Sequence, residues 1–130
     1  MASIPQSDSQ TPIRIPRPSR ERAQVFGYIL RSGWILDFGR KHNIDPQGVK
    51  DQFNLIMESV ELIRREIMKD GEFATVWYIS YGQPDEVAQI YVASNFSRQR
   101  VSMTLALIRA NVEKLKKFLG TTDEPRWMNL

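Results

Sequence analysis

The chain has 130 residues, 42% hydrophobic and 25% charged, with a formal net charge of +3, which is ordinary for one globular domain. It holds no cysteine, which excludes disulfides, thiolate nucleophiles and cysteine-ligated zinc or iron–sulfur sites. No apolar run is long enough to cross a bilayer and no secretory leader is visible. We therefore expect an intracellular protein outside the membrane, in the cytoplasm or the nucleus.

Charge is distributed unevenly along this sequence. Residues 97–119 carry six basic side chains against one acidic, whereas residues 43–72 carry four basic and seven acidic. The first 42 residues hold seven basic and three acidic groups. Such segregation favours binding to a polyanion or assembly through complementary charge, because summed fields steer partners without dictating a fold.

Residues 1–18 are expected to form a disordered Arg/Pro-rich tail. Four of the seven prolines fall here, with few large apolar groups to offset the entropy of ordering. An extended conformation would hold Arg14 and Arg17 in solvent. The tail is then either a binding arm or a solvated leader.

A first helix is expected over residues 20–41, with Ser19 as its N-cap. Its main apolar side chains recur every four residues, at Phe26, Leu30, Trp34 and Phe38. Further apolar residues leave little polar surface, so this helix is central to the core or shared with a partner. Each of its three glycines costs about 1 kcal/mol relative to alanine. Either another helix approaches closely or the helix breaks near Gly33.

A second helix is expected between Asp45, a suitable N-cap followed by Pro46, and Gly71. Its apolar side chains step by four and three residues in a heptad seam, at Val49, Phe53, Ile56, Val60, Ile63 and Ile67. We expect Phe53 and Ile56 to be buried along this seam, with Glu58 on the polar face.

The pattern then changes to alternation, which predicts a β-hairpin. Residues 73–81 form the first strand and residues 87–93 the second, with turn residues between them. Both faces of the hairpin are largely apolar, so helices or another subunit must cover it. We interpret the strand aromatics as core, with a surface for stacking unpaired bases as the alternative. These aromatics are Trp77, Tyr78, Tyr81 and Tyr91.

A last helix is expected between Ser97 and Gly120, with a second heptad seam starting at Val101. Arg98, Arg109 and Lys116 align beside this seam, whereas Arg100 and Lys114 point away from it. The alternation over residues 98–105 resembles the ribbon of ribbon–helix–helix DNA-binding proteins. The second helix that completes that fold has no counterpart, because ten residues follow Gly120.

Together these elements predict an α+β fold with the order α-α-β-β-α. A β-hairpin is packed by helices, and a long basic helix ends a single domain over residues 19–120. Residues 121–130 are expected to be a C-terminal tail, in which Trp127 and Met128 dock onto the body. Two heptad seams supply more apolar surface than the hairpin needs, so we expect self-association, as a dimer.

The sequence offers little for catalysis. His42 is the only histidine, and it follows two basic residues at an expected helix end, where an imidazole satisfies the helix dipole. No nucleophile elbow, phosphate-binding loop or dinucleotide-binding motif is present. Glu58 and Glu61 are close in sequence but lie on an exposed face. We therefore expect no enzymatic activity, no cofactor and no metal site.

The basic segments carry the functional prediction. We expect a non-enzymatic, self-associating protein that binds RNA or DNA largely independently of sequence, through its basic last helix and its N-terminal arm. The expected phosphate contacts are Arg98, Arg100, Arg109, Lys114, Lys116, Lys117, Arg14, Arg17, Arg20 and Arg22. The alternative is a protein-interaction adaptor or assembly subunit whose basic helix docks on an acidic protein partner.

Overall fold

The computed structural model describes residues 23–79, 85–95 and 104–130. In chain order these residues form β1 (Gln24–Arg31), α2 (Ser32–Lys41), α3 (Gln52–Lys69), β2 (Thr75–Tyr78), β3 (Glu86–Ser94), α5 (Leu105–Leu119) and β4 (Arg126–Asn129). The expected α+β class is confirmed. In the described part of the chain, no helix is both long and apolar enough to cross a membrane.

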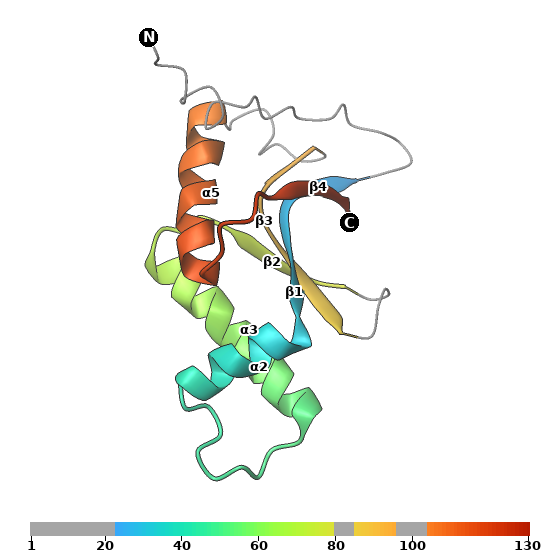
Figure 1. Cartoon of the computed structure of the whole chain (residues 1–130), viewed down its shortest axis with the longest axis vertical. Helices are drawn as coiled ribbons and strands as arrows, with labels where there is room; N and C mark the ends of the chain where they lie inside the picture. The colour runs from blue at the N-terminus through green and yellow to red at the C-terminus, as the bar shows by residue number, and fades with distance from the viewer. Residues whose placement is uncertain (1–22, 80–84, 96–103) are drawn as a thin grey trace.

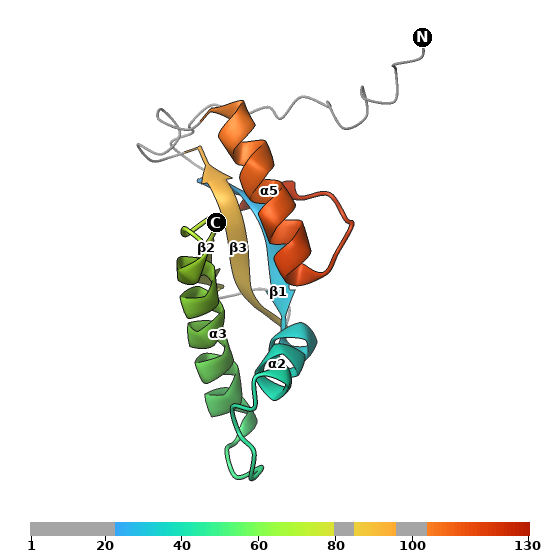
Figure 2. The ribbon, with the colours of Figure 1, turned by 90° about the vertical axis from the view of Figure 1, so that its left-hand side faces the viewer.

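The strands form one antiparallel sheet with the order β2-β3-β1-β4. The expected hairpin is present, because β2 pairs with β3 and places Val76 opposite Ile90. Strand β1 lies in the middle, between β3 and β4. Figure 2 shows α3 and α5 side by side on one face of this sheet, with α2 at its lower end.

The expected helix over residues 20–41 is wrong in its first half. Residues 24–31 form β1, and the extended backbone of Arg31 (φ −96°, ψ 155°) leads into α2. Phe26 and Leu30 are four residues apart, and an even spacing places two side chains on one face of a strand as well as of a helix. The strand prevails because β1 pairs with β3 on one side and β4 on the other. The helix therefore begins close to Gly33, where the sequence indicated a break.

A bulge in β3 lies opposite Gly27, where Val92 is the extra residue between Tyr91 and Ala93. The register against β3 shifts between Phe26 and Gly27. A Cβ atom at Gly27 would lie 2.0 Å from the main-chain oxygen of Ile90, a separation that only glycine allows. Because a bulge bends the strand that carries it, β3 curves at this point.

The main core fills the space between the sheet and the helices. Ile35, Ile63, Ile90, Ile108 and Leu115 are fully buried there. The ring of Phe118 on α5 lies 5.7 Å from that of Phe38 on α2 and 6.0 Å from that of Phe73. Apolar burial of this kind is the main source of stability for the fold.

The heptad seam of α3 is buried only in its C-terminal half. Val60 and Ile63 are inaccessible, whereas Phe53 is 69% exposed and Val49, just before the helix, is 75% exposed. The expectation that Phe53 is buried is therefore wrong. Figure 1 shows the reason, since the first turns of α3 extend beyond the end of the sheet. Ile56 is half-buried against the core.

Helices α3 and α5 begin at other residues than the sequence predicts. Asp51 caps α3, accepting a hydrogen bond from the Asn54 amide at 2.8 Å. Thr104 caps α5 through the amide of Leu107, at 3.1 Å. Gly120, with a left-handed φ of 71°, ends α5 as expected.

Residues 121–130, expected to be a tail, contribute the strand β4 to the sheet. The Trp127 ring lies 5.1 Å from that of Phe26. Met128 packs with Val25 and Tyr91 in a second, smaller core. The docking expected of Trp127 and Met128 thus takes place within the sheet itself.

Candidate functional site

The sheet face opposite α3 and α5 is hollowed. The hollow has a volume of about 660 Å³. Alternation along the strands determines which side chains reach it. Leu30 and Ile90 belong to the core between the sheet and the helices, so their neighbours Ile29 and Gln89 point to the other face. Trp77 pairs with Gln89, which pairs with Ile29, so these three side chains form a row across β2, β3 and β1.

A hydrogen bond closes one side of the hollow. Gln89 is 6% exposed, and its Nε2 donates to the main-chain oxygen of Asn129 at 2.7 Å. Strand β1 separates these two strands in the sheet, so the bond crosses the face of the central strand. The C-terminal residues are thereby held over this face, where Met128 and Leu130 line the hollow together with Trp77.

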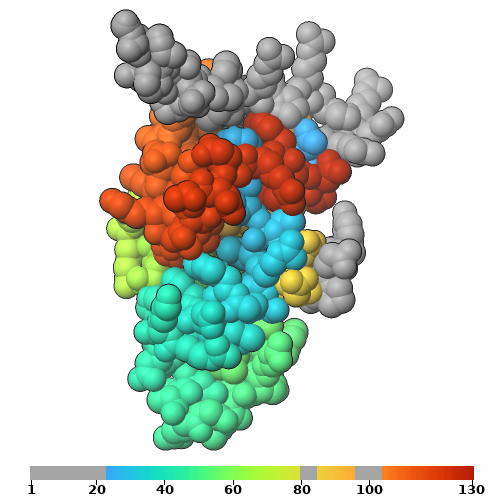
Figure 3. Space-filling model, viewed as in Figure 1, coloured from blue at the N-terminus to red at the C-terminus, as the bar shows by residue number. Residues whose placement is uncertain are grey.

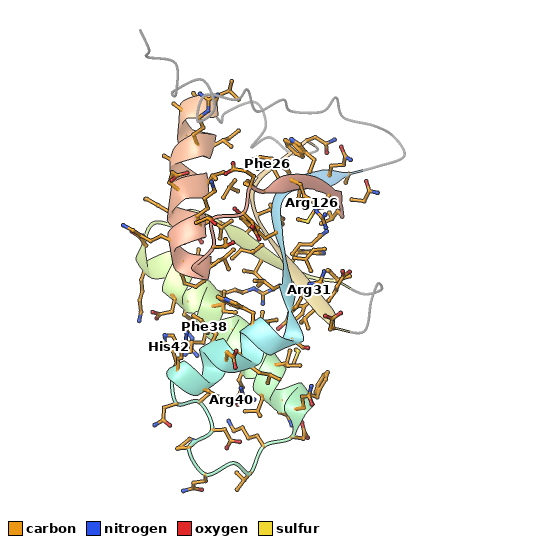
Figure 4. All side chains as sticks on the ribbon, viewed as in Figure 1. Phe26, Arg31, Phe38, Arg40, His42 and Arg126 are labelled. Carbon is orange, nitrogen blue, oxygen red and sulfur yellow. The ribbon has the colours of Figure 1, made fainter. Side chains whose placement is uncertain are left out.

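Two arginines lie on this face, and they differ in their ion pairs. Arg31 lies 3.2 Å from Asp85 and 3.3 Å from Glu86. Arg126 is exposed and lines the hollow, and it has no ion-pair partner within residues 23–79, 85–95 and 104–130. Figure 4 shows both arginine side chains on the side of the sheet away from α5. The hollow thus presents an accessible guanidinium beside apolar surface.

Trp77 is the accessible aromatic of the hollow, with 56% of its surface exposed. Two of the other expected stacking residues, Tyr78 and Tyr91, behave as core. Tyr91 is 8% exposed, and Tyr78 lies under Arg64, whose guanidinium carbon is 5.0 Å from the ring centre. Burial raises the pKa of both tyrosine hydroxyls. The core interpretation is therefore confirmed for Tyr78 and Tyr91 and wrong for Trp77.

Arg64 also covers the outer edge of β2. Its Nη2 donates to the main-chain oxygen of Val76 at 3.0 Å. An edge strand with free carbonyl groups is a template for pairing with a further strand, and this contact occupies one of those groups. The β2 edge is therefore partly covered at Val76.

Helix α5 brings together four of the expected phosphate-binding side chains. Lys116 is only 18% exposed, and its Nζ pairs with Glu124 and lies 3.8 Å from Glu113. A phosphate would have to displace Glu124 to reach it. Lys114 and Lys117 are exposed, and in the described part of the chain neither has an ion-pair partner. Arg109 is half-buried.

The remaining expected contacts lie outside the described residues. They are Arg14, Arg17, Arg20, Arg22, Arg98 and Arg100. The same holds for the tail over residues 1–18, for Tyr81 and for most of the ribbon-like stretch, of which Thr104 and Leu105 start α5.

Arg126 is not among the site residues that the sequence predicts. The residues around it carry a weak local signal, since Arg126 and Met128 alternate with Trp127 as in a short strand. Four residues are too few for that alternation to be distinctive. Only the pairing with β1 places Arg126 opposite Gly27 and at the hollow.

His42 contributes to the structure at the C-terminal end of α2. Its ring stacks on that of Phe38 with centroids 4.2 Å apart, and its Nδ1 lies 2.9 Å from the Phe38 main-chain oxygen. These contacts fit the helix-end role that the sequence suggests. Among the residues described, no group of three or more His, Asp or Glu side chains is arranged to hold a metal ion.

No protein-family model, no curated protein and no solved structure matches this chain.

Proposed function

We propose that this protein is a non-enzymatic protein-interaction adaptor that receives a peptide segment of a partner in the hollow of its sheet. The observation that carries this proposal is the presence of Trp77 and Arg126 in one hollow. Tryptophan and arginine are the residues on which protein interfaces most often depend, because they combine large contact area with directed polar groups.

The lining of the hollow defines the chemistry of the partner segment. Ile29 and Leu130 offer apolar surface, so the segment contributes at least one apolar side chain. The Arg126 guanidinium favours a carboxylate, with which it forms two parallel hydrogen bonds. Glu86 also lines the hollow, and Arg31, which it shares with Asp85, offsets part of its charge. The acidic partner expected from the sequence thus meets the sheet face instead of the basic helix.

Selection from a library of random peptides tests this function, with the wild-type chain as bait. We expect enrichment of peptides that combine acidic with aromatic or aliphatic side chains. Trp77→Ala and Arg126→Glu are each expected to weaken the selected peptides by about tenfold or more, as interface anchors do. Both side chains are exposed, so the fold is retained, which thermal unfolding checks.

Lys114→Glu is the matched control, since it makes the same charge change on α5, outside the hollow. Peptide binding that is unaffected by Trp77→Ala and Arg126→Glu would contradict the proposal, and so would the absence of any enriched peptide.

Nucleic-acid binding is the second candidate, and the exposure of Lys114 and Lys117 favours it. Both lysines lie on the outer surface of α5, away from the buried face formed by Ile108, Val112 and Leu115. The arginines of the N-terminal segment would add further phosphate contacts. Contacts of this type are electrostatic and independent of base sequence, so their signature is a dependence on salt.

A further inference from the structure

We infer that a second copy of this chain binds at the start of α3 and pairs with it in antiparallel orientation. The surface concerned is the tip patch, formed by Val49, Phe53 and Met57. These side chains are 75%, 69% and 37% exposed. Phe53 and Met57 are one turn apart on α3 and therefore share a face of the helix, and Val49 lies in the segment just before its start.

The tip patch is held in place by its own chain. Figure 3 shows that the segment from α2 to the start of α3 forms the lower end of the molecule. Helices α2 and α3 pack closely there, since a Cβ atom at Gly39 would lie 2.3 Å from the Ser59 Oγ. The Asp45 carboxylate accepts hydrogen bonds from the Val49 and Lys50 amides, at 3.2 and 3.0 Å. A partner therefore meets a preformed surface, which lowers the entropic cost of binding.

The same surface offers both a protruding ring and a place to receive one. A shallow hollow of about 480 Å³ lies beside Met57, with Ile44, Glu58, Glu61 and Arg65 as its other lining residues. Phe53 precedes Met57 by one turn of the helix. A two-fold interface needs a self-complementary surface, and an antiparallel pair places Phe53 of each copy at the hollow of the other.

The charges along the flank of the tip patch are compatible with the antiparallel orientation. Within one chain, Lys50 pairs with Glu58, and Glu61 pairs with Arg64, so much of this charge is balanced before a second copy binds. In an antiparallel pair, Lys50 of each copy lies next to Glu61 of the second copy. A parallel pair would bring lysine to lysine and glutamate to glutamate, which is unfavourable.

This inference is independent of the proposed function, because the tip patch and the hollow of the sheet share no residue. Sedimentation equilibrium over a wide concentration range measures the dimer dissociation constant. We expect Phe53→Glu to raise this constant by about tenfold or more, whereas Trp77→Ala leaves it unchanged. Phe53 is largely exposed, and an unchanged unfolding transition shows that the variant still folds. A wild-type chain that stays monomeric at all concentrations would overturn the inference.

Cross-linking tests the orientation, and the absence of natural cysteines makes the result unambiguous. A Lys50→Cys chain is mixed with a Glu61→Cys chain that carries a removable tag, and the mixture is oxidised. We expect a disulfide between the two different chains, while Lys50→Cys alone stays uncross-linked. A Lys114→Cys chain is the control for random collision. Cross-linking of Lys50→Cys to itself, or no more cross-linking than the control shows, would overturn the antiparallel pair.

Discussion

The side chain of Gln89 donates a hydrogen bond to the main chain of Asn129 across the face of the central strand, at 2.7 Å. The two residues belong to strands that are not neighbours in the sheet. Together with the packing of Met128 against Tyr91, this contact couples the C-terminal end of the chain to β3, and it defines one side of the hollow. Its removal therefore affects both stability and the shape of the candidate site.

Gln89→Ala is expected to lower the free energy of unfolding by about 1–3 kcal/mol, because it leaves the Asn129 carbonyl oxygen without its donor in a part-buried contact. Urea denaturation measures this loss. Gln52→Ala is the matched control, since Gln52 is exposed at the start of α3 and its loss is expected to change stability by less than about 0.5 kcal/mol. Equal effects of the two substitutions would show that the Gln89 contact does not stabilise the fold.

Gly27→Ala is expected to destabilise the protein by about 3 kcal/mol or more, at the upper end of overpacking costs. The added methyl group would lie 2.0 Å from the main-chain oxygen of Ile90, which cannot move without breaking the sheet. At Gly33 no atom outside the local backbone lies within 4 Å of the position that a Cβ atom would take. Gly33→Ala in α2 is therefore expected to stabilise by roughly 0.5–1 kcal/mol. Thermal unfolding tests both expectations, because Gly27→Ala is expected to lower the melting temperature and Gly33→Ala to raise it.

Ile63→Ala is expected to cost about 2–5 kcal/mol through lost burial and the cavity that remains. Ile63 is inaccessible, whereas Phe53 on the same heptad seam is 69% exposed. Phe53→Ala is accordingly expected to change the stability of the monomer by less than about 0.5 kcal/mol. Chemical denaturation at low protein concentration, where self-association does not contribute, separates the two. A large loss for Phe53→Ala would mean that this side chain is covered in the monomer.

Tyr28 is expected to make stability depend on pH at the alkaline end. Burial, followed by the nearby Glu124, Asp123 and Glu113 carboxylates, raises the pKa of its hydroxyl to about 12. The hydroxyl donates to the main-chain oxygen of Asp123 at 2.6 Å, which only the neutral form can do. Because the folded pKa lies above the ordinary value of 10, the contribution is complete below pH 10 and is lost as the pH rises towards 12.

Tyr28→Phe removes this group with little change of shape, so it is the reference for the pH measurement. The difference in unfolding free energy between wild type and Tyr28→Phe is expected to shrink between about pH 10 and about pH 12. A difference that stays constant over this interval would indicate that the Tyr28 hydroxyl titrates alike in both states.

Nucleic-acid binding by α5 is expected to involve Lys114 and Lys117. Each neutralised phosphate contact changes the slope of log K against log salt by about −0.7 to −0.9, so the double substitution to glutamine flattens it by roughly 1.4–1.8. Lys116→Gln is the internal comparison and is expected to leave the slope nearly unchanged, because Glu124 already holds that ammonium group. Binding that is insensitive to salt would remove the nucleic-acid candidate.

Local signals in the sequence were sufficient for the elements that are closed by local contacts. The C-terminal half of α3, the end of α5 at Gly120 and the pairing of β2 with β3 all follow from side-chain period and turn residues. In these elements, interactions within a short stretch of chain are sufficient to favour the observed conformation over the alternatives. The α+β class could therefore be predicted without distant contacts.

Distant contacts decided the rest. The spacing of Phe26 and Leu30 suits a strand and a helix equally, and only pairing with β3 and with the C-terminal β4 selects the strand. The heptad pattern of α3 marks Phe53 and Ile63 alike, but the sheet ends before it reaches Phe53. The spacing of apolar residues along the sequence shows which side chains share a face. Which face is covered, and which remains open as at Trp77, depends on where elements far apart in the sequence pack, and this is a property of the tertiary structure alone.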